Sequence, residues 1–163
     1  MADDLDVVTY VAETARECWS EIWPGWKRFA GHPDPSGGTA SSDTCIPTSM
    51  ALRKMLDRCV RDWNWHVVGG RPTVRTPLGG LWYPDRRGGP HVWVEGRRKG
   101  ARITVDITAD QFGGPEVVVE EGIPDTYRAN ATRALIVKYE MSERMTSGLW
   151  VSVLSAALES QTA

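Results

Sequence analysis

Apolar side chains recur every three to four positions near the start of the chain. Within residues 4–20 they are Leu5, Val8, Val11, Ala12, Ala15 and Trp19. This spacing places them along one face of an α-helix, so the pattern predicts an amphipathic helix there. Pro24 and Gly25 are expected to end it, because neither residue favours the interior of a helix.

A stretch rich in Gly, Pro and Ser over residues 31–42 predicts a loop after this helix. A second helix is expected over residues 46–62, with Asp43 or Thr44 as its N-cap. Pro47 suits the first turn, where a missing backbone N–H costs no hydrogen bond within the helix. Cys45 is therefore expected at the N-terminus of this helix.

The middle of the chain carries short segments of β-type composition, separated by clusters of Gly and Pro. These predicted strands cover residues 66–68, 73–76, 91–95, 102–108, 116–120 and 134–139. An apolar stretch over residues 147–158 predicts a C-terminal helix. Because the strands follow one another and do not alternate with helices, the order favours an α+β fold with an antiparallel β-sheet packed against helices. The length of 163 residues suits a single domain over 1–163.

Charge and hydropathy exclude several classes of partner. The formal net charge is −2 and the pI is about 5.9, so we expect no interaction with nucleic acid or with anionic membranes. The start of the chain lacks the basic region and the uninterrupted apolar stretch that are typical of a secretory signal. No apolar stretch in the sequence approaches the ~18 residues of a membrane span. A cytoplasmic location is the resulting expectation.

The three cysteines have no CxxC or CxxH spacing, so neither a disulfide framework nor a structural zinc site is expected. The sequence contains no HExxH motif, so a metal-dependent hydrolase is not favoured, and we expect no cofactor. Cys18 and Cys59 follow helical apolar spacing and are interpreted as buried structural residues. Cys45 follows a flexible loop and opens a helix. There the unpaired backbone N–H groups and the helix dipole stabilise a thiolate and can bind an oxyanion.

His91 and Asp106 are connected by a predicted β-hairpin. Residues 96–100, GRRKG, carry Gly at both ends and predict the turn. If the loop comprises the four residues 97–100, Gly96 faces Ala101 and His91 directly faces Asp106. Facing side chains lie on one side of the sheet with Cβ atoms about 4.5–5.5 Å apart. The carboxylate is then close enough to accept the ring N–H and orient the histidine. His32 lies among prolines in a predicted loop, and His66 follows two tryptophans near a helix end, where a packing or capping role is expected.

These segments resemble the papain-like and transglutaminase-like cysteine hydrolase superfamily. The resemblance covers residues 41–114 and rests on three motifs: a Cys that opens a helix, the strand HVW, and a hairpin that ends in VDITADQF. It is closest to small bacterial and phage-type members, including papain-like toxin and deamidase domains. It implies a Cys on a central helix packed against an antiparallel sheet, with Cys45 as nucleophile, His91 as general base and acid, and Asp106 as the orienting group.

The chain departs from the papain pattern in two places. No glutamine precedes Cys45, and Ile46 and Pro47 stand where a Trp or Gly is expected beside the nucleophile. These departures favour the transglutaminase-like branch. Three further residues are candidates for oxyanion or substrate contacts, each with a packing or hydrogen-bonding role as the alternative: Thr44, Trp93 and Gln111. Asp110 is the rival acidic residue, but it lies beyond the predicted strand pair.

The leading hypothesis is a thiol-dependent amide hydrolase or acyl transferase that acts on a protein or peptide substrate. Peptide bonds, isopeptide bonds and glutamine carboxamides all offer the carbonyl that a thiolate attacks. The alternative is a catalytically inactive papain-like fold that binds another protein through its tryptophan-rich groove. The reactivity of Cys45 distinguishes the two.

Overall fold

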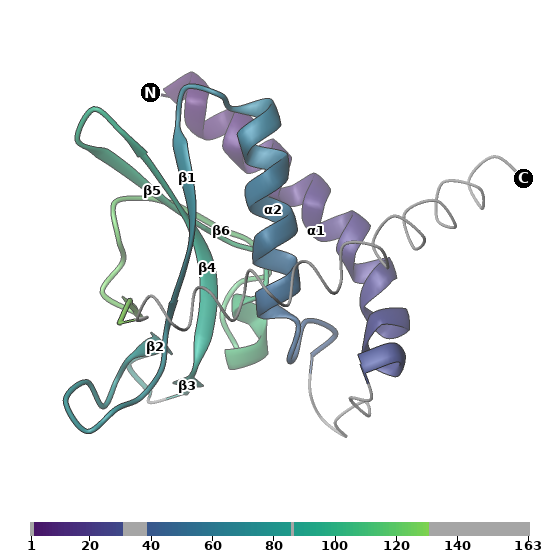
Figure 1. The fold of residues 1–163 in the computed structure, drawn as a ribbon, viewed down its shortest axis with the longest axis vertical. Coiled ribbons are helices and arrows are strands. Elements are labelled where there is room, and N and C mark those ends of the chain that lie inside the picture. Colours follow the sequence, from purple (N-terminus) through teal and green to yellow (C-terminus); the bar gives the residue numbers. More distant parts are fainter. Residues whose placement is uncertain (1, 31–38, 86, 131–163) are drawn as a thin grey trace, which may run out of the picture. The chain divides into compact units, whose positions relative to one another are not determined.

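The computed structural model of the protein describes residues 2–30, 39–85 and 87–130, all within one compact unit, and these residues form an α+β fold. Helices α1 (Ala2–Ala30) and α2 (Cys45–Cys59) lie on one side of an antiparallel sheet (Figure 1). The strand predicted over 134–139 and the helix predicted over 147–158 lie outside the described residues. The single domain over 1–163 therefore stays a prediction.

Two antiparallel sheets make up the β-structure. The larger has the strand order β1-β4-β5-β6 and the smaller the order β3-β2-β7. Their bounds are β1 Asn64–Gly70, β2 Gly80–Trp82, β3 Gly88–Gly89, β4 His91–Arg98, β5 Ala101–Asp106, β6 Val118–Glu121 and β7 Tyr127–Arg128, with a short 3-10 helix η1 at Ala109–Phe112. The predicted strands at 66–68, 91–95, 102–108 and 116–120 are thus confirmed with shifted ends.

Helix α1 does not end at Pro24, so that prediction is wrong. Proline at this position removes one backbone hydrogen bond, but the residues around it are held by burial. Trp23 is almost fully buried and donates its indole N–H to Thr48 Oγ1 at 2.9 Å. Lys27 is also buried and donates to the Thr39 carbonyl at 3.2 Å. Packing against α2 and the loop before it therefore outweighs the local preference of Pro24.

Strand β4 is central in the larger sheet and is buried on both faces. Val92 and Val94 point to one face, and His91 and Trp93 point to the other, because side chains alternate along a strand. Trp93 belongs to a core cluster with Leu81, Ala109, Val118 and Tyr127, which come from the smaller sheet, η1 and β6. His91 therefore starts a strand whose neighbours on both sides exclude water.

The hairpin between β4 and β5 is tighter than predicted. Arg98 pairs with Ala101, so the loop contains only Lys99 and Gly100, both with positive φ (47° and 85°). The predicted four-residue loop is therefore wrong, and the register differs by two residues. Continuing the observed pairing places Asp106 level with Trp93, not with His91. A shift of two keeps every side chain on its face, so His91 and Asp106 still share one side of the sheet.

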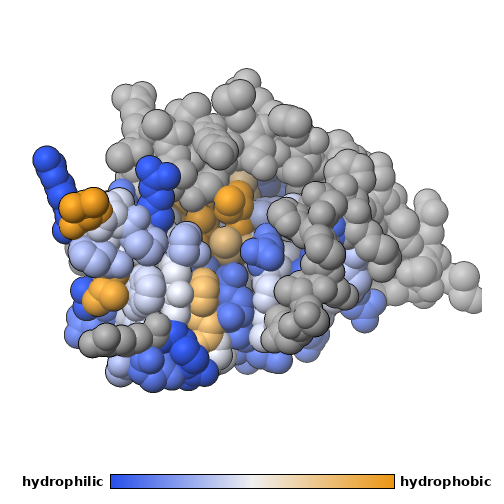
Figure 2. Space-filling view, turned by 90° about the horizontal axis from the view of Figure 1, so that it is seen from below, coloured by the Kyte–Doolittle hydropathy of each residue, from blue (hydrophilic) through white to orange (hydrophobic). Residues whose placement is uncertain are grey.

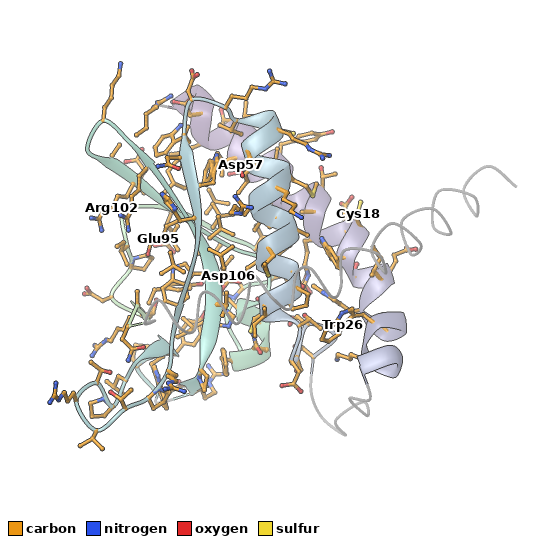
Figure 3. The ribbon with its side chains drawn as sticks, viewed as in Figure 1. Cys18, Trp26, Asp57, Glu95, Arg102 and Asp106 are labelled. Carbon is orange, nitrogen blue, oxygen red and sulfur yellow. The ribbon has the colours of Figure 1, made fainter. Side chains whose placement is uncertain are left out.

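Two other local predictions are wrong. Residues 73–76 form a turn, in which the Thr73 N–H donates to the Thr76 carbonyl at 3.0 Å and the two hydroxyl groups lie 2.6 Å apart. Cys18 and Cys59 are exposed, although their spacing indicated burial. Cys18 lies on the side of α1 that faces away from the sheet (Figure 3). Each cysteine borders the apolar face of its helix without lying on it.

In the part of the chain that the structure describes, no helix combines the length and the apolar character needed to cross a membrane.

Candidate active site

Cys45 is the first residue of α2, and a side chain one turn later fixes where that end of the helix lies. Ser49 is buried and donates its hydroxyl to the Val92 carbonyl at 2.9 Å. Val92 directly follows His91. Because residues four apart lie on the same side of a helix, this bond brings Cys45 to the beginning of β4. Both elements begin at the lower end of the molecule in Figure 1.

The His91 ring is bonded to Asp106 as predicted, although the two are diagonal neighbours. His91 Nε2 lies 2.6 Å from Asp106 Oδ2, and both side chains are fully buried. Asp106 lies between β4 and α2 in Figure 3. Diagonal positions have Cβ atoms about 7–8 Å apart, a span that the combined length of the imidazole and the carboxylate bridges.

Asp106 accepts four hydrogen bonds, which hold both of its oxygens. Besides His91, the Thr108 backbone N–H and hydroxyl donate to Oδ1 at 2.8 and 3.0 Å, and the Tyr127 hydroxyl donates to Oδ2 at 2.9 Å. Burial raises the pKa of Asp106, but the His91 charge and these hydrogen bonds outweigh burial and lower it below 3.8. The carboxylate is therefore ionised and immobile.

Opposing effects act on the protonation of His91. Burial lowers its pKa, while the charge of Asp106, the hydrogen bond to Asp106, and a hydrogen bond and charge from Cys45 raise it. The net effect raises the pKa of His91 above its ordinary 6.5. Cys45 is therefore close enough to interact with the His91 ring, and Asp106 holds Nε2 of that ring. The structure brings all three predicted residues together.

Exposure to solvent differs among the three residues. Cys45 is partly exposed, whereas His91 and Asp106 are buried. Figure 2 views the molecule from the end at which α2 and β4 begin, and hydrophobic residues lie there among hydrophilic ones. Solvent therefore reaches part of Cys45 but not the side chains of the His91–Asp106 pair.

Aromatic side chains hold the His91 ring in place. Trp93 stacks nearly parallel to it, with centroids 6.3 Å apart and planes at 18°. Phe112 approaches edge-on with centroids 5.4 Å apart, and Tyr127 lies at 6.5 Å. Trp93 is fully buried and directs its indole N–H to Glu95 at 3.3 Å. Trp93 thus packs against the His91 ring and has no exposed surface that a substrate could contact.

Gln111 is also in the site, bonded to the histidine. Its Nε2 lies 3.0 Å from His91 Nδ1 and 2.9 Å from the Thr108 carbonyl oxygen. The residue lies in η1, directly after β5 in the chain, and is partly exposed. Gln111 was predicted as an oxyanion or substrate candidate, and in the structure its amide contacts His91.

Thr44 is bonded to the segment that precedes α2. Both its hydroxyl and its backbone N–H donate to the Ser41 carbonyl, at 2.7 and 3.1 Å. It occupies the N-cap position, but its side chain makes no cap hydrogen bond. The backbone N–H groups of Cys45 and Ile46 lie in the first turn of α2, where no acceptor exists within the helix. These two N–H groups are therefore donors without a partner inside the helix.

Asp110 takes no part in orienting the histidine. It accepts two hydrogen bonds from the Arg16 guanidinium, at 2.8 and 2.9 Å, and a third from the Ser41 hydroxyl at 2.5 Å. Arg16 also donates to the Ile107 carbonyl at 2.7 Å. This buried cluster joins α1, η1 and the segment that leads into Cys45.

Two residues of the site were not anticipated from the sequence. Thr108 follows Asp106 by two positions, and this Asp-x-Thr spacing is typical of a side chain that accepts a local backbone N–H. That signal was available. Tyr127 lies on a strand of only two residues, 21 positions after Asp106. No local pattern indicates that its hydroxyl reaches the carboxylate.

Comparison with family models, curated proteins and solved structures gives no match.

Proposed function

We propose that the protein is a thiol-dependent amide hydrolase or acyl transferase that uses Cys45, His91 and Asp106. The observation that carries this proposal is the environment of the His91 ring. Its Nε2 is bonded to the Asp106 carboxylate, which accepts four hydrogen bonds, and the ring interacts with Cys45 at the start of α2. This arrangement has the nucleophile, the base and the orienting group that covalent acyl transfer needs. It also supports a papain-like or transglutaminase-like core.

In the proposed reaction the Cys45 S–H bond breaks and its proton moves to His91. The sulfur attacks the substrate carbonyl carbon, and the N–H groups of Cys45 and Ile46 bind the resulting oxyanion. His91 then returns the proton to the departing amine or ammonia, and a thioester remains on Cys45. Water or a second amine resolves the thioester. Asp106 keeps the imidazolium oriented throughout and remains ionised.

The geometry favours a protein or peptide substrate. Cys45, the first residue of α2, is partly exposed, and the face seen in Figure 2 has hydrophobic residues among hydrophilic ones. A segment of polypeptide can be laid across such a surface, and its carbonyl can reach the sulfur. Hydrolysis, deamidation and amine transfer share every step up to the thioester, so the nature of the second nucleophile and of the leaving group separates them.

A protein extract incubated with the purified protein tests this proposal through three readouts. New peptide N-termini report peptide-bond cleavage, released ammonia reports deamidation, and incorporation of a labelled primary amine reports acyl transfer. We expect at least one signal, and its loss in Cys45→Ala and His91→Ala. The matched control is Cys18→Ala, which removes an exposed thiol outside the site. An activity that Cys45→Ala retains in full would contradict the proposal and leave the protein-binding alternative.

A further inference from the structure

The amide of Gln111 is fixed by two neighbours, and this fixes the hydrogen-bonding role of His91. The Thr108 carbonyl only accepts hydrogen bonds, so the group 2.9 Å from it is the Gln111 NH2. The same nitrogen lies 3.0 Å from His91 Nδ1. Its second N–H therefore points at the ring, and Nδ1 must present a lone pair. The proton of the neutral ring is then on Nε2, where Asp106 accepts it.

Gln111 and Cys45 consequently compete for one position on the ring. An imidazole nitrogen has a single lone pair in the ring plane, and the thiol proton must move to Nδ1, because Nε2 is bonded to Asp106. Once Nδ1 is protonated it becomes a donor and faces the donor NH2 of Gln111. Two donors that face each other repel. Gln111 in this position therefore opposes formation of the thiolate–imidazolium pair.

The ring itself is held in place, whereas Gln111 is able to move. Trp93, Phe112 and Tyr127 surround the imidazole, and Asp106 holds its other nitrogen. Gln111 is partly exposed and lies in a helix of only four residues. Relief of the donor–donor conflict therefore requires movement of the glutamine.

The charged and titratable groups around the histidine act in different directions. Asp106 on β5 favours the protonated ring, as does Cys45 on α2 when it is ionised. Tyr127 on β7 donates to Asp106. Burial and the charge of Asp106 raise the pKa of Tyr83, which follows β2. Asp110 in η1 is already paired with Arg16. Burial of the ring and the donor N–H of Gln111 favour the uncharged form.

We propose that Gln111 is a positioning residue that opposes protonation of His91 at Nδ1 and must leave Nδ1 before the ring takes the Cys45 proton. This inference rests on the proposed function and adds a step that regulates the activation of Cys45. In the activating step the Sγ–H bond breaks, the Nδ1–H bond forms, and the electron pair stays on sulfur. A substrate carbonyl that accepts the Gln111 N–H removes the competing donor and so couples substrate binding to activation.

The test is the pH profile of iodoacetamide alkylation in a Cys18→Ser, Cys59→Ser background, in which Cys45 is the thiol that reacts. Gln111→Met keeps the side-chain length and removes both donors. We expect the profile to move to lower pH and the rate at pH 7 to rise about three- to tenfold, the effect of one lost neutral hydrogen bond. Nitrogen NMR of the His91 ring should show Nδ1 protonated up to a higher pH than in the unsubstituted protein.

Asn64→Met is the matched control, because it makes the same amide-to-thioether change at an exposed position of β1 opposite Arg97. It should leave the profile unchanged. If Gln111→Met fails to fold, Gln111→Ala serves as the second variant. A folded Gln111 variant with an unchanged profile, or with one moved to higher pH, would overturn the role of Gln111. His91→Ala separates the two proposals: if it does not alter the profile of the unsubstituted protein, the proposed function itself fails.

Discussion

At the scale of single residues, Asp106 determines how the site is built. Each of its oxygens accepts two hydrogen bonds, from four donors on three different residues. A buried carboxylate needs such partners, because an unpaired charge in a protein interior is strongly destabilising. With all directions occupied the carboxylate cannot rotate, so the orientation of His91 also depends on the donors of Thr108 and Tyr127.

Tyr127→Phe tests this dependence directly. It removes the hydroxyl that donates to Asp106 Oδ2 and keeps the ring that packs against Trp93. Burial and Asp106 raise the pKa of Tyr127, so the hydroxyl is protonated and donates across the working pH range. We expect a loss of about 1.5–3 kcal/mol in urea unfolding and slower Cys45 alkylation. Tyr83→Phe removes a hydroxyl that does not donate to Asp106 and should change neither quantity as much; equal effects would contradict this role.

The His91–Asp106 pair should make stability depend on pH. The pKa of His91 is raised from 6.5, so its contribution is complete below that pH and is lost as the pH rises through the higher folded value. The pKa of Asp106 is lowered from 3.8, so its contribution is complete above that pH and is lost as the pH falls through the lower folded value. The pair therefore stabilises most between these two reference values.

Urea unfolding of the unsubstituted protein and of Asp106→Asn across this range measures the effect. The difference in unfolding free energy should be largest, about 3 kcal/mol, between pH 4 and 6.5, roughly the two reference pKa values. It should shrink towards alkaline and strongly acidic pH. A difference that stays constant from acid to alkali would show that the pair does not titrate as described.

The sequence predicted the partnership of His91 and Asp106 but not its geometry. Alternation along a strand depends only on whether a position is odd or even, so the shared face survived an error of two residues in the loop. The turn itself requires a positive φ at Lys99, a backbone conformation that residues other than Gly rarely adopt. The start of α2 near Cys45 was predictable because a loop and a proline mark the beginning of this helix. The contact of Tyr127 with Asp106 could not be predicted, because it depends on where a distant strand of two residues lies.

At the scale of elements, the cluster around Arg16 connects the two ends of the site. Its guanidinium holds Asp110, the neighbour of Gln111, and Asp110 holds Ser41, which lies four residues before Cys45. Arg16 also stacks over Trp23, 4.6 Å from the ring centroid. The long helix α1 therefore acts as the support against which η1 and the segment before α2 are positioned.

Arg16→Met should destabilise the protein by about 3–5 kcal/mol, because it leaves the Asp110 carboxylate buried without its cation. It should also slow Cys45 alkylation, since the segment before α2 loses its anchor. The control is Arg53→Met, which removes a partly exposed partner of Asp57 within α2 and should cost no more than about 0.5 kcal/mol. Thermal and urea unfolding measure both variants, and similar costs would refute the anchoring role.

The sequence could not predict this cluster. Arg16 and Asp110 are separated by 94 positions, and helical periodicity only indicates which residues of α1 avoid the apolar face. The continuation of α1 past Pro24 has the same origin, since Trp23 and Lys27 are fixed by contacts with distant residues. Local preference predicted where elements exist, and tertiary contacts decided where they end.

At the scale of the whole described unit, the site lies where several segments end together. Helix α2 and strand β4 both begin there, and β5 and η1 meet there, so residues from separate parts of the chain converge on one ring. The α+β class follows from the order of helices and strands and was predicted. The smaller sheet was not, because two of its three strands contain only two residues each, and no periodicity exists over so short a length.

The central claim is that His91 activates Cys45. The most direct measurement is the pH dependence of Cys45 alkylation in the Cys18→Ser, Cys59→Ser background, compared with the same protein carrying His91→Ala. We expect Cys45 to react at neutral pH about tenfold or more faster than in the His91→Ala protein, because the base accepts its proton. Two superimposable profiles that both rise as an ordinary thiol does, near pH ~8.5, would contradict the claim.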